Sequence, residues 1–149
     1  MSRALPFLAV LSLGFAPAPF PKRSAPVSDA DAVVGVWQLV SFDHDGWHSP
    51  APDVRPIRLT VTRKTMKLSH VGPMGESPGD EWAYSLDARA TPKSMDGKGQ
   101  GGEHLPWVYL LDRDTLTLCG CTARHERPKE LTAVKGTGQL LMVFKRLQR

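Results

Sequence analysis

The residues best suited to chemistry are two cysteines and a histidine, Cys119, Cys121 and His125, in the stretch "LTLCGCTARHERP". Thiolates and imidazoles bind zinc and take part in redox chemistry. Structural zinc usually takes four such ligands in paired spacings, whereas this chain offers only His104 as a further donor. C-x-C also differs from the C-x-x-C of thioredoxin-like sites. We therefore predict no catalytic residue, no metal and no cofactor, and keep as an alternative a zinc or enzymatic site around Cys119, Cys121 and His125.

The same two cysteines raise the question of a disulfide. On a strand, Cys119 and Cys121 have side chains on one side and Cα atoms about 6.5 Å apart. This is the long edge of disulfide geometry, in which Cα distances centre on about 5.5–6 Å. Gly120 lets the chain tighten, so a strained, easily reduced bridge in an oxidising compartment is an alternative to two independent thiols.

Four large aromatic residues form the second candidate site. "EWAYSLD" and "PWVYLLD" share a W-x-Y-x-L-D pattern that puts Trp82, Tyr84, Trp107 and Tyr109 in the same phase. Such residues either fill a small barrel or line a pocket for an apolar molecule with a polar tip, because their rings are apolar and their O–H and N–H groups form hydrogen bonds. We take them as ligand-binding residues for a small hydrophobic molecule. The alternative is a fully packed barrel that serves as an envelope structural or protein-interaction module.

The elements that would position these residues are short strands, because apolar and polar residues alternate with a period of two. Strands are expected at 36–42, 57–62, 65–70, 82–86, 107–112, 115–119 and 139–145, with short pieces at 93–96 and 130–132. Ser28, followed by aspartates, predicts one short N-terminal helix, and Asp45-Gly46 predicts a tight turn. Glycine-rich loops are expected at 71–81 and 97–103. The fold class is all-β: an antiparallel up-and-down β-barrel of about eight strands, since closure removes exposed strand edges.

The strand phase also assigns faces. In the first strand it places Trp37 and Leu39 on one side and Phe42 on the other. In the hairpin that follows Trp107, a two-residue turn pairs Tyr109 with Leu116 and puts both cysteines on the opposite face. Arg113 is a poor residue for such a turn, and a three-residue turn would exchange the two faces.

The N-terminal segment indicates export. A basic residue, an apolar run from Leu5 to Phe15 and then small residues follow the order of a secretory signal peptide. The run is too short for a membrane span, which needs about 20 residues, so no stable span is expected. We assign 1–18 to a signal peptide, 19–27 to a proline-rich spacer and 28–149 to the barrel domain, and expect an exported protein in the periplasm, the cell envelope or the medium.

The net charge of +4 arises mostly from this N-terminal segment. The first 26 residues hold three basic residues and no acidic one, which leaves 16 basic and 15 acidic residues in the rest of the chain. No run of Lys and Arg remains to follow a phosphate backbone, so no nucleic-acid partner is expected. The sequence identifies no protein partner.

Three stretches, "VVGVWQLVSFDHDG", "YLLDRDTLTLC" and "RPKELTAVKGTGQLLMVFKR", together resemble an uncharacterised lipocalin-like domain family common in planctomycete bacteria. The resemblance spans 33–146 and implies a lipocalin-like barrel without implying an activity. It assigns Gly35 and Trp37 to the family's G-x-W, whose tryptophan closes one barrel end beneath a basic residue from the last strand. Lys145 or Arg146 would take that part, in a cation–π contact worth about 0.5–2 kcal/mol.

Overall fold

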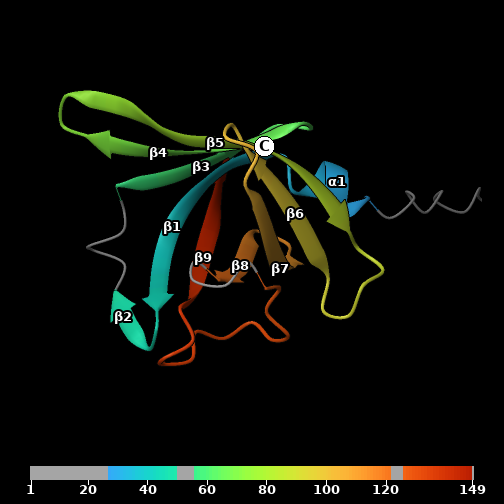
Figure 1. Ribbon diagram of the computed structural model, residues 1–149. Helices are drawn as coiled ribbons and strands as arrows, with labels where there is room; N and C mark the ends of the chain where they lie inside the picture. The colour runs from blue at the N-terminus through green and yellow to red at the C-terminus, as the bar shows by residue number, and fades with distance from the viewer. Residues whose placement is uncertain (1–26, 50–55, 122–125, 149) are drawn as a thin grey trace, which may run out of the picture.

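Eight antiparallel strands close into a barrel, to which one further strand and one short helix are attached (Figure 1). The computed structural model describes residues 27–49, 56–121 and 126–148. The elements are α1 (Asp29–Ala32), β1 (Gly35–His44), β2 (Trp47–Ser49), β3 (Ile57–Val61), β4 (Thr65–Gly72), β5 (Gly75–Asp87), β6 (Ser94–Gly99), β7 (His104–Asp112), β8 (Thr115–Cys121) and β9 (Gln139–Gln148). The expected all-β barrel with one short helix is therefore confirmed.

The ring closes between the first and the last of its strands. From β3 to β9 each strand pairs with the next along the chain, and β1 pairs with both β3 and β9. The extra strand β2 pairs with β1 through a hairpin whose turn, Asp45-Gly46, has φ of 52° and 81°. Positive φ at both positions is what a type I′ turn requires, so the turn expected at Asp45-Gly46 is confirmed.

The antiparallel order gives the barrel two different ends. The closed end holds α1 and the turns before β4, β6 and β8. The open end holds the β4–β5 turn and the β6–β7 loop. Ser28 is the N-cap of α1, where its side chain accepts a hydrogen bond from the backbone N–H of Asp31 at 3.2 Å, as predicted.

The core lies inside the barrel, where alternate side chains of every strand of the ring point inward. The largest fully buried side chains are those of Trp37, Tyr109 and Phe144. The other members of this core are Val33, Leu39, Leu59, Val61, Met66, Trp82, Met95, Leu116, Leu118, Leu140 and Met142. Because the expected phase puts Tyr109, Leu116 and Leu118 on one face, their shared burial agrees with it.

The β7–β8 hairpin differs from the expected register by two residues. Tyr109 pairs with Leu118 rather than Leu116, and the two-residue turn is Arg113-Asp114, with φ of 50° at Arg113. A shift of two residues preserves the faces, because the side-chain period of a strand is also two. The cysteines therefore lie on the outer face whichever of these two registers is used.

A bulge in β1 corrects the face expected for Phe42. The pairing with β9 shifts between Leu39 and Ser41, so one extra residue is accommodated on β1. Phe42, opposite Met142, is thereby moved to the inner face, where it packs against the core. Strict alternation along the sequence does not reveal this change of phase.

Two further expectations are wrong. The loop expected at 71–81 is a continuation of the β4–β5 hairpin, since Gly72 pairs with Gly75. Residues 130–132 form no strand and belong to the segment 126–138, which lies against the outside of the barrel. The strand β2 was not expected, because its three residues pair only beyond the ring.

Candidate functional site

The closed end of the barrel is built around Trp37. Its indole Nε1 donates a hydrogen bond to the Val33 carbonyl at 2.9 Å, and the guanidinium carbon of Arg146 lies 3.9 Å from the centroid of its ring. Arg146 also donates to the carbonyl oxygens of Val34, at 2.9 Å, and Ala32. A residue of β9 thus joins the tryptophan of β1 to the last residue of α1 and to the backbone just beyond it.

The other two residues expected at this end are placed differently. Lys145 points away from Trp37 and donates to the Thr115 hydroxyl at 2.6 Å. Gly35 is the first residue of β1 and pairs with Val61. Of the two basic residues considered for the contact with Trp37, the structure places Arg146 there.

The two tyrosines also belong to the closed end. The Tyr109 hydroxyl donates to Asp29 Oδ2 at 2.8 Å, and Lys93 donates to the same oxygen at 2.7 Å. The Tyr84 hydroxyl donates to the Thr62 carbonyl at 2.7 Å. Burial raises the pKa of both tyrosines, and the Asp29 carboxylate raises the pKa of Tyr109 further. Both phenols therefore act as neutral hydrogen-bond donors.

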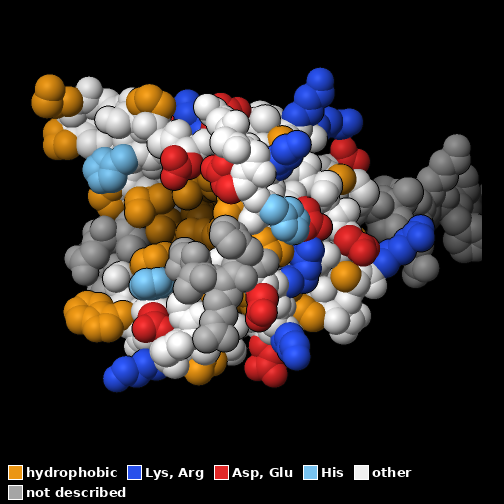
Figure 2. All heavy atoms as spheres, viewed as in Figure 1, with side chains coloured by type: hydrophobic (Ala, Val, Ile, Leu, Met, Phe, Trp, Pro, Cys, Tyr) orange, Lys and Arg blue, Asp and Glu red, His pale blue; other side chains and the backbone are white. Residues whose placement is uncertain are grey.

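The half of the barrel nearer the open end contains a cavity of about 260 Å³, which we name the apolar cavity. Its lining residues are Leu39, Phe42, Ile57, Leu68, Trp107, Leu140 and Met142. None of them is polar, and all belong to the core or pack against it. An apolar hollow is visible on the face shown in Figure 2.

A second hollow, the mouth pocket, of about 460 Å³, adjoins the apolar cavity. Leu68 and Trp107 line both. The remaining lining residues of the mouth pocket are Gly79, Asp80, Glu81, Trp82, Gln100, Glu103 and Leu105. Of the four aromatics expected to bind ligand, the structure brings Trp82 and Trp107 to these hollows, and Tyr84 and Tyr109 line neither.

Glycines on the inner face make room for both tryptophans. A Cβ at Gly97 would lie 2.9 Å from Trp82 Cδ1, and a Cβ at Gly120 would lie 2.8 Å from Trp107 Cδ2. Such distances are too short for any side chain, so the glycines of β6 and β8 let the indole rings lie directly on the sheet. The glycine-rich stretch 97–103 thus shapes a hollow inside the barrel.

The cysteines lie on the outside of the barrel, under the segment 126–138. The Cys119 thiol donates to the Thr132 carbonyl at 3.3 Å, and the Cys121 thiol donates to the Thr137 carbonyl at 3.4 Å. Both are free thiols in the structure, each with its own partner, and the alternative bridge is not formed there. Burial raises the pKa of the Cys119 thiol, which disfavours the reactive thiolate.

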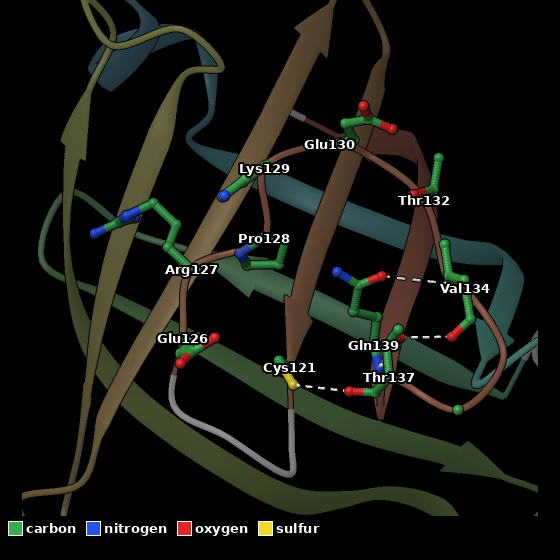
Figure 3. Close-up of a pocket in the computed structure, with 11 residues that line it drawn as sticks. Cys121, Glu126, Arg127, Pro128, Lys129, Glu130, Thr132, Val134, Thr137 and Gln139 are labelled. Atoms are coloured by element: carbon green, nitrogen blue, oxygen red, sulfur yellow. Dashed lines mark hydrogen bonds between the residues drawn. The ribbon is translucent and has the colours of Figure 1, made fainter.

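A third hollow, of about 350 Å³, lies between this segment and β8 and β9 (Figure 3). Cys121 lines it together with residues of both charges, Glu126, Arg127, Lys129 and Glu130. Arg127 is tied to the barrel wall, because it donates to the Trp107 carbonyl at 2.6 Å and to Asp96 Oδ1 at 2.6 Å. These contacts hold the segment 126–138 against the outer face of the barrel, over the two cysteines.

The zinc alternative involves Cys119, Cys121, His125 and His104. His125 lies outside the described residues, and His104 contacts Asp96 at 2.8 Å, away from the cysteines. Within 27–49, 56–121 and 126–148, no three His, Cys, Asp or Glu residues are grouped so that they could hold a metal ion.

In the same ranges no helix has the length and apolar character needed to cross a bilayer. The expected signal peptide, 1–18, and most of the spacer, 19–27, also lie outside the described residues.

The fold and the two inner hollows define the class of this protein: a closed antiparallel β-barrel with one end sealed and the other hollowed. Comparisons with protein-family models, with curated proteins and with solved structures found no match. The resemblance to the planctomycete lipocalin-like family therefore stays a prediction.

Several residues of the candidate site were not found from the sequence. Phe42 was missed because of the bulge in β1, and Leu68 and Met142 looked like ordinary core residues. Glu103 was missed because its position depends on how a loop folds back on the barrel. A signal for Gly97 and Gly99 was present, since two glycines two residues apart fall on one face of a strand.

Proposed function

We propose that this chain is an exported, non-catalytic barrel protein that binds one small apolar molecule through its open end. The observation that carries the proposal is the apolar cavity, about 260 Å³ in volume and lined by apolar side chains alone. Known ligand pockets span about 300–1,000 Å³, and with the adjoining mouth pocket the available space falls in that class. The fold and resemblance support a lipocalin-like mode of binding.

The apolar cavity has no polar lining, which favours binding over catalysis there. The adjoining mouth pocket has carboxylates, but no Ser, Thr, Cys, His or Lys is among its described lining residues. A cavity without a nucleophile, acid or base can hold a ligand but offers it no reacting group. Unfilled apolar space also costs stability, by about 24 cal/mol per Å³ in other proteins, so a ligand that fills it gains contacts that the empty barrel lacks. Ligand binding is thus the use of this space that its chemistry supports best.

Leu68 offers a direct test, because it lines both inner hollows. Decanol titrated into the protein should bind saturably by calorimetry, and Leu68→Trp should weaken binding at least about tenfold by filling the space. The matched control is Leu110→Trp on β7, since Leu110 is 49% exposed and lines neither hollow. Equal binding by both variants, or no saturable binding by the unmodified protein, would contradict the proposal.

One observation favours protein interaction as a second candidate. Trp47, next to the β1–β2 turn, is 79% exposed, and Met74, in the β4–β5 turn, is fully exposed. Both hairpins extend beyond the ring (Figure 1). Exposed large apolar side chains are enriched where proteins meet. Replacing both residues with serine should leave decanol binding unchanged, because neither lines the cavity. If the same double variant no longer binds a protein partner that the unmodified protein binds, the second candidate is supported.

A further inference from the structure

The mouth pocket has charged groups of one sign. Its charged lining residues are Asp80, Glu81 and Glu103, and no described Lys or Arg lines it. Glu81 alternates with the inward Trp82 and pairs across the strands with Lys67, so its side chain lies on the outer face, and the carboxylates that face the pocket are those of Asp80 and Glu103. The pocket also contains Trp82 and Trp107, whose ring faces carry partial negative charge. The polar end of the inner space is therefore suited to positive charge.

The carboxylates of Asp80 and Glu103 also differ from most others in the protein. Six acidic residues, Asp29, Asp31, Asp43, Glu76, Asp96 and Asp114, each pair with a Lys, Arg or His side chain. Asp80 and Glu103 make no side-chain hydrogen bond or ion pair with any other described residue. Their charges are left for solvent or for a ligand.

Glu103 is directed inward by the glycines of the β6–β7 loop. Its Oε1 occupies the place where a Cβ of residue 99 would lie, and its Oε2 would be 2.7 Å from a Cβ of residue 101. Gly99 pairs with Trp82 and is two residues beyond Gly97, so it faces the same interior as that indole. The glycines thus allow the carboxylate to lie across the inner rim beside Trp82.

Trp82 provides an independent sign of an incomplete site. The residue is 6% exposed, it lines the mouth pocket, and its buried Nε1 has no acceptor among the described residues. A buried N–H without an acceptor costs about 1–3 kcal/mol, so such groups usually have a partner when a site is filled. An acceptor atom of a bound molecule would satisfy this N–H, whereas the charge preference of the pocket comes from its carboxylates.

From these contacts we infer that the mouth pocket holds the cationic head of an amphipathic ligand, an ammonium group, while its apolar tail lies in the apolar cavity. This inference rests on the proposed function and specifies its ligand class. The carboxylates attract the cation, and the indole faces of Trp82 and Trp107 add cation–π contacts. A fatty acid is disfavoured, because its carboxylate would lie beside the like charges of Asp80 and Glu103.

Three ligands with the same ten-carbon chain test the inference: decylammonium, decanol and decanoate. Calorimetry at low ionic strength should show decylammonium binding about tenfold more tightly than decanol, and decanoate binding less tightly than decanol. The preference for decylammonium should shrink as salt is added, because the charges at the mouth are solvent-exposed.

Glu103→Gln should reduce the preference for decylammonium over decanol several-fold, measured as the ratio of the two dissociation constants within the same variant. Glu130→Gln is the matched control, since it makes the same change of charge at the outer pocket. Chemical denaturation reports folding in both variants. If decanol binds without any preference for decylammonium, or if decanoate binds as tightly, this inference is overturned and the proposed function stands. If none of the three ligands binds, both fail.

Discussion

The guanidinium carbon of Arg146 lies 3.9 Å from the ring centroid of Trp37. A side chain of the last strand therefore covers the tryptophan of the first strand and closes that end of the barrel. Three kinds of contact meet in this one side chain: the aromatic face, the backbone carbonyls of Ala32 and Val34 at the end of α1 and beyond it, and the Asp114 carboxylate at 3.0 Å. The Arg146 side chain is only 7% exposed, so most of these contacts are shielded from water.

Arg146→Ala should lower the free energy of unfolding by about 2–4 kcal/mol, because it removes the cation–π contact and leaves two carbonyl oxygens without a donor. Chemical denaturation measures the change. Lys145→Ala on the same strand should cost less than about 1 kcal/mol, since Lys145 makes one exposed hydrogen bond. Equal losses in the two variants would show that Arg146 does not seal the barrel.

The two tyrosines should titrate abnormally. Tyr84 and Tyr109 are the only tyrosines in the chain, and burial raises the pKa of both above the ordinary value of about 10. The folded protein should therefore show little phenolate absorbance at pH 10, and unfolding at that pH should release it. Because the unfolded state loses these protons first, stability should be unaffected below about pH 10 and fall as the pH rises beyond it. Normal titration of both phenols in the folded state would contradict the hydrogen bonds to Asp29 and Thr62.

Gly120 should tolerate no side chain. Gly120→Ala places a Cβ 2.8–3.0 Å from three carbons of the Trp107 ring and should cost about 1–3 kcal/mol of stability, with weaker decanol binding as the ring is displaced. Gly72→Ala is the control, because the nearest atoms to its Cβ are 4.0 Å away, and its stability should stay within about 1 kcal/mol of the unmodified protein. A harmless Gly120→Ala would mean that Trp107 does not lie on β8.

The two thiols should react at different rates. Cys119 is fully buried with a raised pKa, whereas Cys121 is partly exposed. A disulfide reagent should modify one thiol of the native protein at least about tenfold faster than the other, and both after unfolding. Cys121→Ser should abolish the fast phase, and Cys119→Ser should keep it. Protein that yields no thiols until it is reduced would instead establish the strained bridge.

The barrel itself follows from local patterns, and its inner surface follows only in part. Alternation predicted the faces of Tyr109, Leu116 and Leu118, and even a register error of two residues left them on the core side. Phe42 was misplaced because a bulge inserts a single residue, and the pattern of one strand does not record how its neighbour pairs.

The candidate site was harder to predict, because its parts are brought together by distant pairings. The W-x-Y pattern identified four inward aromatics, but which of them face open space depends on what fills each end of the barrel. The hydroxyls of Tyr109 and Tyr84 donate hydrogen bonds to Asp29 and Thr62, respectively, and both acceptors are far from the tyrosines in sequence. Glu103 can lie inward because Gly99 and Gly101 have no side chains in its way. The sequence shows these glycines but does not show which side chain fills the space beside them.

The pairing of β1 with β9 has a consequence for how the chain folds. β1 begins at Gly35 and β9 at Gln139, so the barrel cannot be completed before almost all the residues between them have emerged from the ribosome. Contacts so distant in sequence slow folding, because a long loop must be closed before they form. Until that moment β1 and β8 each present an unpaired edge to other chains, and a truncation that removes β9 would make this aggregation-prone state permanent.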